Sequence, residues 1–550
     1  MIGYNCKYAP VEIMAGFGED CVLINNEADN FDYSSSVLHP NMCSHAKAML
    51  EDIHKDGYDG LLLMNCCDSS RRTADAVKDE KPGISCFLDL PDCSSECAVE
   101  RFKNELLGLI AELENKTGKP FDVSSFLSSF KSDEKPCQNK YVAILGARSS
   151  KTLIKAAKNC FSDVDVYDMT CSNNRKVPLF ETEENEPIEN IMQKYARALL
   201  SQSPCMRMRN IDRRADLTEN ENCVGIIYST VKFCDYYDFE YSRLKTGKIP
   251  MIRVETDFTN QSYGQLMTRI EGFAETVGKT KGEHKKMNSA GKYYAGIDSG
   301  STSTELVVAD KSGKIISNVM VRTGANAASG AKKALEKSGV DLNDIVLTVA
   351  TGYGRKNIDF ADSDVTEITC HAKGAKHLFD RVETIIDIGG QDSKVIRLDE
   401  NGKVCGFVMN DKCAAGTGRF LENMAKVLEL DMGDMALKGL DYKKDLTISS
   451  MCTVFAESEV VSLIAQNHSA ADIVHGLNKS VAVKTKALVG NSVNKGTVMM
   501  TGGVANNKGV VSELEKILNT KIFVPENPEF CGALGAALIA IEQAQGKAGV

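Results

Sequence analysis

The strongest constraint on the fold is a motif that occurs twice in the second half of the chain. Residues 297–308 read Ile-Asp-Ser-Gly-Ser-Thr-Ser-Thr-Glu-Leu-Val-Val, and residues 386–397 read Ile-Asp-Ile-Gly-Gly-Gln-Asp-Ser-Lys-Val-Ile-Arg. In both, an apolar strand ends in Asp-x-Gly, small or polar residues make a tight turn, and a second strand returns. One such hairpin is an ordinary turn, but two in matching frames predict an internally duplicated α/β domain.

The two turns also predict a nucleotide site. Backbone N–H groups of a glycine-rich turn can face phosphate groups while an aspartate holds a hydrated cation. We therefore expect Asp298 and Asp387, together with Gln391, to be catalytic. A third segment, the apolar run 498–500, breaks into Thr-Gly-Gly at 501–503, where missing side chains leave room for adenosine. The predicted nucleotide-binding residues are Ser299, Gly300, Ser301, Thr302, Gly389, Gly390, Gly502, Gly503 and Asn506.

This arrangement resembles the superfamily of actin, Hsp70 and the sugar kinases, which implies a duplicated, ribonuclease H-like ATPase fold. Within that superfamily, residues 293–543 resemble the activator ATPases of 2-hydroxyacyl-CoA dehydratases and related benzoyl-CoA reductase subunits. The resemblance implies binding of ATP and Mg²⁺. A sugar kinase would need a catalytic base beside a sugar pocket, and the sequence pattern indicates no residue for that role. The strings that carry the resemblance lie at 295–302, 350–355, 367–374, 387–393, 410–419 and 452–459.

Two cysteines of this half precede predicted helices. Cys413 lies before the amphipathic stretch 419–428, and Cys452 lies before 455–465. Free N–H groups at a helix N-terminus favour an anionic group and lower the pKa of a thiol. A four-iron cluster takes four thiolates, whereas this pattern supplies two in each chain. In the activators that the chain resembles, one 4Fe-4S cluster bridges two subunits, so the resemblance implies a homodimer with Cys413 and Cys452 as ligands.

A length of 550 residues predicts more than one domain. The polar, glycine-flanked stretch 278–291 is the predicted linker, with domains at 1–277 and 292–550. A charged segment divides the first domain into lobes of about 1–135 and 136–277. Before the linker, short apolar runs alternate with amphipathic stretches, which predicts Rossmann-like α/β lobes with parallel sheets. These runs lie at 60–64, 84–90, 141–145, 224–227 and 249–254.

The first half resembles the dehydratase subunits that such activators serve, in a shortened form. The resemblance implies a second iron–sulfur cluster, with Cys43, Cys67 and Cys234 holding three irons and leaving one open. Cys67 and Cys234 also follow predicted strands, and ligands gather at the carboxyl ends of parallel strands. The neighbouring Cys66 leaves the register open, although an Asn-x-Cys-Asp pattern selects Cys67. The strings that carry this resemblance lie at 40–47, 65–72, 231–235, 249–250, 255–257 and 264–271.

Three further thiols leave a second arrangement open. Cys205 and the pair Cys93 and Cys97 can complete a second cubane, which would make a bridged double-cubane cluster. A free cysteine is more often a small buried apolar residue, and we favour that interpretation for Cys93 and Cys97.

Composition narrows the classes of function. The net charge of −10 is spread along the chain, without the basic stripe that nucleic acid or an anionic membrane surface requires. There is no apolar run of membrane-spanning length and no signal peptide, so we expect a cytoplasmic protein. In a reducing compartment, 19 cysteines indicate metal or catalytic thiols and not a disulfide framework.

Together these features predict a fused enzyme of anaerobic metabolism. ATP hydrolysis would drive a low-potential electron from the bridging cluster to the N-terminal one, for reductive or radical chemistry such as dehydration of a 2-hydroxyacyl-CoA. A donor such as ferredoxin or flavodoxin and a second dehydratase subunit are expected partners. The alternatives are an ATP-binding regulatory switch whose N-terminal half docks a partner, and a small-molecule reductase of the double-cubane type.

Overall fold

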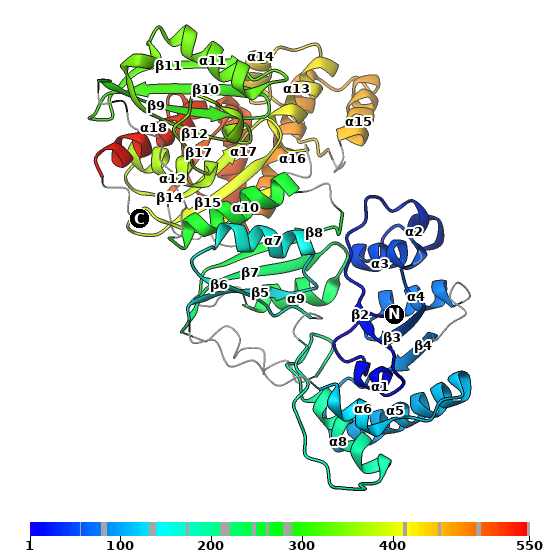
Figure 1. Ribbon diagram of the computed structural model, residues 1–550. Coiled ribbons are helices and arrows are strands. Elements are labelled where there is room, and N and C mark those ends of the chain that lie inside the picture. Colours follow the sequence, from blue (N-terminus) through cyan, green and yellow to red (C-terminus); the bar gives the residue numbers. More distant parts are fainter. Residues whose placement is uncertain are drawn as a thin grey trace. The chain divides into compact units, whose positions relative to one another are not determined.

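The chain forms two compact units, Met1–Ile270 and Glu271–Val550 (Figure 1). The division falls within helix α10 (Tyr263–Thr276), and most of the predicted linker lies outside the described residues. Within the described part of the chain, no helix is both long enough and apolar enough to cross a membrane. The computed structural model describes residues 1–55, 57–78, 85–130, 139–171, 175–209, 221–244, 249–259, 263–278, 288, 290–410, 415–448, 453–490 and 497–546.

The first lobe of the first unit is built on a parallel sheet with strand order β2-β1-β3-β4. Strand β3 in this sheet is an almost continuous apolar run, because helices cover both faces of the sheet. The strands are β1 (Ile2–Tyr4), β2 (Cys21–Leu23), β3 (Gly60–Asn65) and β4 (Ser85–Asp89). The helices are α1 (Val11–Ala15), α2 (Asp32–Val37), α3 (Ser44–His54), α4 (Asp68–Val77), α5 (Glu96–Thr117) and α6 (Val123–Ser128).

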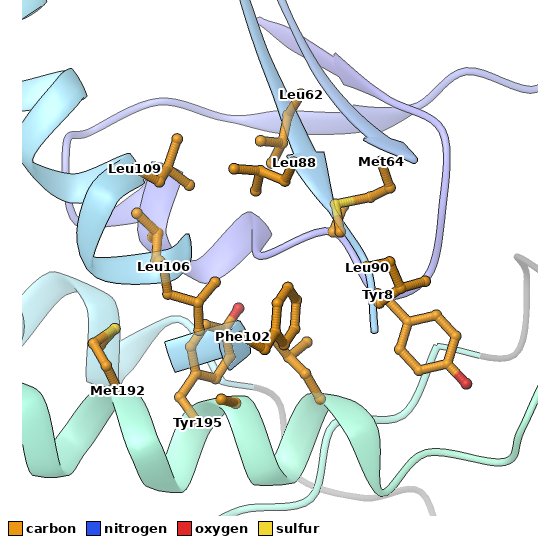
Figure 2. Packing of buried hydrophobic residues seen from close by; sticks show 14 of the residues in the cluster. Tyr8, Leu62, Met64, Leu88, Leu90, Phe102, Leu106, Leu109, Met192 and Tyr195 are labelled. Carbon is orange, nitrogen blue, oxygen red and sulfur yellow. The ribbon is translucent and has the colours of Figure 1, made fainter. Parts of the chain in front are cut away.

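The core of this lobe includes a helix from later in the chain. Leu62 and Leu88 on the sheet pack in one buried cluster with Phe102 and Leu106 of α5 (Figure 2). Tyr195 of α8 (Ile188–Leu200) belongs to the same cluster and is fully buried. Part of the first lobe's core therefore comes from beyond residue 136, because the apolar face of α8 is buried there.

The second lobe is a parallel sheet with strand order β6-β5-β7-β8. This sheet and the first confirm the predicted Rossmann-like α/β class. Its elements are β5 (Tyr141–Gly146), α7 (Lys151–Cys160), β6 (Asp165–Asp168), β7 (Cys223–Val231), α9 (Asp235–Leu244) and β8 (Met251–Thr256).

One buried arginine ties the two lobes together. The Arg148 guanidinium, just after β5, donates to the carbonyl oxygens of Asn5 and Ile24 at 2.7 Å each. It also lies 2.7 Å from Nε2 of His45. These contacts hold the ends of β1 and β2 of the first lobe against the end of β5.

The second unit contains the predicted duplication. Its two five-stranded sheets have the orders β11-β10-β9-β12-β13 and β16-β15-β14-β17-β18. In each, three antiparallel strands are followed by two parallel ones, in matching positions. The structure therefore confirms the predicted internal duplication of this α/β unit.

The strands of the second unit divide between its two sheets. The first sheet contains β9 (Tyr293–Ser299), β10 (Ser303–Ala309), β11 (Ile315–Arg322), β12 (Ile345–Thr351) and β13 (Ser363–Asp364). The second contains β14 (Val382–Ile388), β15 (Ser393–Leu398), β16 (Val404–Asn410), β17 (Thr497–Thr501) and β18 (Ile522–Phe523). The α-helices are α11 (Ala327–Ser338), α12 (Glu367–Leu378), α13 (Gly418–Val427), α14 (Met432–Lys438), α15 (Thr453–Ala465), α16 (Ala470–Val489), α17 (Lys508–Leu518) and α18 (Cys531–Ala544).

Candidate functional site

The two predicted catalytic aspartates occupy equivalent places in the two sheets. Asp298 near the end of β9 pairs with Thr351 of β12, and Asp387 near the end of β14 pairs with Thr501 of β17. The hydroxyl of Thr501 donates to Oδ1 of Asp387 at 2.9 Å. The duplicated sequence motif thus gives a duplicated carboxylate position.

A glycine with positive φ follows each pairing threonine. Gly352 has a φ of +83° and Gly502 a φ of +80°. A Cβ at Gly352 would lie 2.6 Å from Oδ1 of Asp298, and a Cβ at Gly502 would lie 2.9 Å from Oδ1 of Asp387. Only glycine allows both this backbone conformation and the close approach, so a side chain at either position would displace the carboxylate beside it.

His371 lies between the two carboxylates. Its Nε2 is 3.6 Å from Oδ2 of Asp298, and its Nδ1 is 3.5 Å from Oδ1 of Asp387. The structure therefore brings the two aspartates of the duplicated motif to one side chain. Burial lowers the pKa of His371, but the carboxylates of Asp387 and Asp298 outweigh it and raise the pKa well above its usual value. A positive charge at His371 offsets the two negative ones.

A second buried cation lies beside Asp387. Nζ of Lys394 on β15 lies 2.8 Å from Asp392, 3.2 Å from Glu367 and 3.4 Å from Asp387. Burial opposes ionisation of Asp387, yet the charges of His371 and Lys394 lower its pKa. Asp387 is therefore held as a carboxylate, the form that accepts hydrogen bonds from the water shell of Mg²⁺.

The turns that follow the two aspartates meet each other. Oγ1 of Thr302 is buried without a hydrogen-bond partner among the described residues. A Cβ at Gly390 would lie only 2.4 Å from that oxygen. The two turns are in contact there, and the unsatisfied hydroxyl of Thr302 is a donor that suits an anionic oxygen beside this contact. The donor set, two carboxylates and two turns, fits Mg²⁺ with a nucleotide phosphate.

The remaining predicted nucleotide-site residues divide into buried and exposed positions. Ser299 is fully buried, and its hydroxyl lies 3.3 Å from that of Thr304. Ser301, Gln391 and Gly503 are exposed. Asn506 is exposed as well and donates to Glu529 at 3.3 Å. The exposed groups are accessible to a ligand, whereas the Ser299 side chain is part of the interior of its turn.

The second turn is bonded to the start of α13. The backbone N–H groups of Gly418 and Arg419 donate to the carbonyl oxygens of Gly389 and Gly390 at 2.9 and 2.8 Å. Phe420 of α13 and residues of α15 share one buried core. Cys413 and Cys452 lie outside the described residues, although α13 begins five residues after the first and α15 begins directly after the second.

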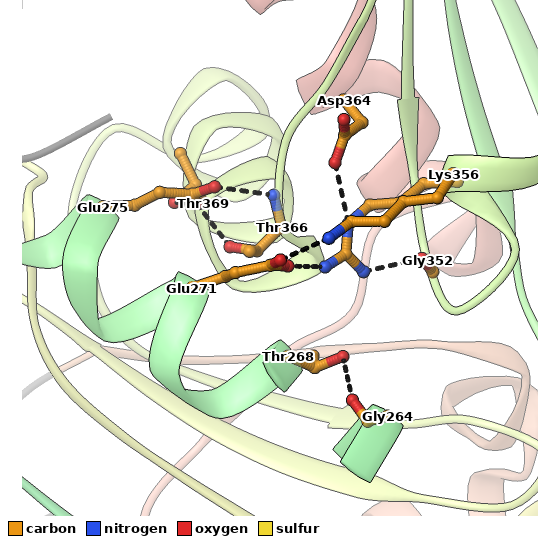
Figure 3. A network of polar contacts seen from close by, with 10 residues as sticks. Gly264, Thr268, Glu271, Glu275, Gly352, Lys356, Asp364, Thr366 and Thr369 are labelled. Carbon is orange, nitrogen blue, oxygen red and sulfur yellow. Dashed lines mark hydrogen bonds and ion pairs between the residues drawn. The ribbon is translucent and has the colours of Figure 1, made fainter. Parts of the chain in front are cut away.

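The loop that contains Gly352 is held from α10. Nη1 of Arg355 donates to the Gly352 carbonyl at 3.0 Å, and Nη2 pairs with Glu271, which also pairs with Lys356 (Figure 3). Glu275, one turn later, accepts from Oγ1 of Thr369 at 2.5 Å. The last turns of α10 thus support the loop beside Asp298.

In the first unit, the structure brings together the three predicted cluster cysteines. Cys43 and Cys67 are the N-terminal caps of α3 and α4, and Cys234 directly precedes α9. Burial raises the pKa of Cys43 to about 11, and a charge at Cys67 or Cys171 adds to the increase. Burial likewise raises the pKa of Cys234, which also responds to Cys43, Cys171 and Cys67. Cys43 and Cys234 pack against one buried apolar cluster, and Cys171 packs against the same cluster.

This set of cysteines is better suited to bind an iron–sulfur cluster than a single metal ion. Among the described residues, no three His, Cys, Asp or Glu side chains converge tightly enough to hold one metal ion. A four-iron cluster needs a wider spacing, since each sulfur binds a different iron. Soft, shielded thiols at helix N-termini are suitable donors for such an anionic cluster.

The other candidate thiols differ in their surroundings. Cys205 is buried in the first-lobe core. Cys93 lies 3.4 Å from the hydroxyl of Ser95, the N-terminal cap of α5, and Cys97 on that helix is exposed. A hydrogen bond with Cys6, together with burial, raises the pKa of Cys66 well above its usual value, although a hydrogen bond with Cys67 opposes the increase.

Comparison with known proteins finds a family match for each half of the chain. The BadF/BadG/BcrA/BcrD ATPase family matches residues 295–540. The D-component of 2-hydroxyglutaryl-CoA dehydratase matches residues 6–141 and 144–277. An activator of lactoyl-CoA dehydratase from Anaerotignum propionicum is 48% identical over 259 residues, which cover 46% of this chain and 100% of that protein. The chain belongs to the BadF/BadG/BcrA/BcrD ATPase family.

Two further proteins illustrate the relationship. The activator of 2-hydroxyisocaproyl-CoA dehydratase from Clostridium difficile, solved with bound ADPNP, is 43% identical with a TM-score of 0.44 and covers 46% of this chain and 96% of that one. The beta subunit of (R)-phenyllactyl-CoA dehydratase from Clostridium sporogenes is 25% identical over 150 residues, 26% of this chain and 40% of that protein. This member of the ATPase family thus carries a dehydratase-related region in the same polypeptide.

Sequence reasoning missed His371, Lys394 and Cys171. His371 and Lys394 stand within or beside the motif strings, but nothing in the spacing shows that their side chains meet Asp298 and Asp387. Cys171 follows β6, a short and only partly buried strand without a clear apolar pattern. Lys394 belongs to the second Asp-x-Gly motif. Its closeness in sequence to that motif's carboxylate was the one signal that could have suggested it.

Proposed function

We propose that this chain uses ATP hydrolysis in its second unit to drive a low-potential electron into a cluster in its first unit. The donor cluster would be a 4Fe-4S cluster held by Cys413 and Cys452 of two chains, and the acceptor would be held by Cys43, Cys67 and Cys234. When bound, the clusters supply one-electron transfer. Catalysis of ATP hydrolysis is assigned to Asp298, Asp387 and Gln391, with Mg²⁺ at the carboxylates.

The observation that carries the proposal is the bond between the second turn and α13. Gly418 and Arg419 donate to Gly389 and Gly390, the residues expected to contact phosphate. Loss of the γ-phosphate that moves this turn also moves the start of α13. Since Cys413 precedes that helix by five residues, its environment changes with the nucleotide. A conformational change with these connections couples hydrolysis to the electron donor.

The required energy is within the range of a nucleotide switch. A tenfold change in an equilibrium is about 1.4 kcal/mol, which for one electron corresponds to about 59 mV. Lowering the potential by roughly 200 mV therefore takes roughly 5 kcal/mol of differential affinity between the two conformations.

The substrate class follows from the relatives. Their names specify activators of 2-hydroxyacyl-CoA dehydratases, and the first unit of this chain matches a dehydratase component. We therefore infer that the electron serves reductive or radical chemistry such as loss of water from a 2-hydroxyacyl-CoA. A homodimer, a second dehydratase subunit, a ferredoxin or flavodoxin donor, and a cytoplasmic location complete the proposal.

The test is to purify the protein without oxygen, count iron, and record the paramagnetic resonance of the reduced clusters with and without ATP. Wild type is compared with Cys413→Ala. We expect about six irons per chain or more, partly retained in the variant, and a signal that changes with ATP. About two irons per chain, all lost in the variant, would instead identify the first unit as a docking module of an ATP-dependent regulator.

A further inference from the structure

Four cysteines, two from each lobe of the first unit, approach one another. Cys43 and Cys67 come from the first lobe, where they start α3 and α4. Cys234 and Cys171 come from the second lobe, where they follow β7 and β6. Since both sheets are parallel, all four lie at the carboxyl ends of strands or at the helix starts beside them.

The backbone around Cys171 is fixed to the strands that lead to Cys234. The N–H of Cys171 donates to the carbonyl of Gly146 at 3.1 Å. Gly146 is the last residue of β5 and pairs with Ser229 of β7. β7 ends at Val231, whose carbonyl accepts from the N–H of Cys234 at 2.9 Å. Cys171 and Cys234 therefore follow β6 and β7, the two strands on either side of β5, at the same end of one sheet.

The backbone beside Cys43 is bonded to the segment that leads to Cys234. The N–H of Ser44, directly after Cys43, donates to the carbonyl of Lys232 at 3.1 Å. Lys232 is two residues before Cys234. The sulfur of Cys67 accepts from the N–H of Ser70 at 3.4 Å, so it faces the open first turn of α4.

Packing supports a single group of cysteines. Cys43, Cys171 and Cys234 all pack against the same buried apolar cluster, which includes Ala147 and Phe258. All four cysteines are half-buried residues.

We propose that Cys171 is the fourth ligand of the N-terminal cluster, so that each of its four irons is held by a cysteine. The inference rests on the proposed cluster at Cys43, Cys67 and Cys234. Binding of the Cys171 sulfur releases its proton to solvent and displaces water from the remaining iron, without any change in electron count. A cluster closed in this way has no iron free for substrate, so it relays electrons to chemistry at another place.

The test uses full-length chains that all carry Cys413→Ala, which removes the cluster of the second unit. Cys171→Ala is compared with Cys171→Ser and with Cys223→Ala. Cys223 is a matched control because it is a buried thiol at the opposite end of β7, with a pKa raised by burial and without a neighbouring thiol among the causes. Iron per chain and the paramagnetic resonance signal of a three-iron cluster are measured before and after brief oxidation with ferricyanide.

We expect the parent and Cys223→Ala to keep about four irons per chain after oxidation. Cys171→Ala should lose about one iron and form the three-iron signal, and an added small thiol should reduce that loss. Complete loss of iron from both Cys171 variants, with unchanged circular dichroism, would also support the proposal. It would be overturned if the parent formed three-iron clusters as readily as Cys171→Ala, or if the Cys171 variants matched the parent. A parent without iron would overturn the proposed N-terminal cluster itself.

Discussion

At the scale of single residues, the nucleotide site is a balance of buried charges. His371 and Lys394 are both buried, and each is within ion-pair distance of Asp387. Unpaired charges would be costly at such positions, whereas here each cation has at least two carboxylate neighbours. This balance keeps Asp387 ionised before a metal ion arrives.

Asp387→Asn should lower the rate of ATP hydrolysis by about 100-fold, equivalent to about 3 kcal/mol of activation free energy. An amide lacks the charge that holds hydrated Mg²⁺, while its size is unchanged. Steady-state phosphate release measures the effect. Asp380→Asn is the control because Asp380 is exposed, and that variant should hydrolyse ATP at the wild-type rate. An Asp387→Asn protein within about threefold of wild type would exclude a catalytic role for this carboxylate.

The buried Glu305 should make the folding stability of the protein depend on pH. It is paired with Asp298 across β9 and β10, and burial, with the nearby Asp298 charge, raises its pKa to about 8. The folded protein therefore keeps a proton that the unfolded chain releases above its ordinary pKa. Stability from this group is present at low pH and is lost as the pH rises toward about 8.

Replacing this group should remove that dependence. Without Mg²⁺, Glu305→Gln should have a higher free energy of unfolding than wild type at about pH 8, by on the order of 2 kcal/mol, and a similar one at about pH 5. Urea unfolding at both pH values is the measurement. Equal stabilities at the higher pH would show that Glu305 ionises normally in the folded protein.

At the scale of elements, the start of α13 and the first turn converge on Gly390. The carbonyl of Gly390 bonds to Arg419, while its Cα faces Thr302 of the opposite half. A single residue thus belongs to the contact between the two halves of the ATPase and to the support of the helix that follows Cys413.

Gly390→Ala should weaken ADP binding by at least about tenfold, or about 1.4 kcal/mol, because the new methyl group separates the two turns. Titration calorimetry with Mg²⁺ present measures the affinity. Gly406→Ala on β16 is the control, since a Cβ there meets nothing within 4 Å. If both variants bound ADP as wild type does, the turns would not form the phosphate site.

The last turns of α10 are an added support of the ATPase unit. Glu271 pairs with the Arg355 side chain, which is only 4% exposed. Glu271→Gln should lower the free energy of unfolding of this unit by about 2 kcal/mol or more, because a buried guanidinium loses a charged partner. Glu542→Gln breaks an exposed pair with Lys373 and should cost less than about 1 kcal/mol. Similar urea midpoints for the two variants would contradict this role of α10.

At the scale of the whole molecule, the sequence was sufficient for the architecture but not for the details of the sites. The duplicated Asp-x-Gly strings predicted the paired sheets and the places of Asp298 and Asp387 because strand ends are local features. The core position of Tyr195 in the first lobe was not predictable, since it depends on a helix that returns from beyond β6. His371 and Cys171 act through partners from distant segments, and no local pattern encodes such contacts.

The fusion itself leads to a kinetic prediction. With donor and acceptor in one polypeptide, their effective concentration is set by the chain and not by dilution. ATP-dependent reduction of the N-terminal cluster in wild type should therefore have the same first-order rate over about a hundredfold range of protein concentration. In a mixture of Cys413→Ala chains, which lack the donor, and Cys234→Ala chains, which lack an acceptor ligand, the rate should rise with concentration. Stopped-flow absorbance, recorded before subunits exchange, measures both rates. A diluted mixture as fast as wild type would mean that the donor serves any acceptor and that joining the two halves gives no kinetic advantage.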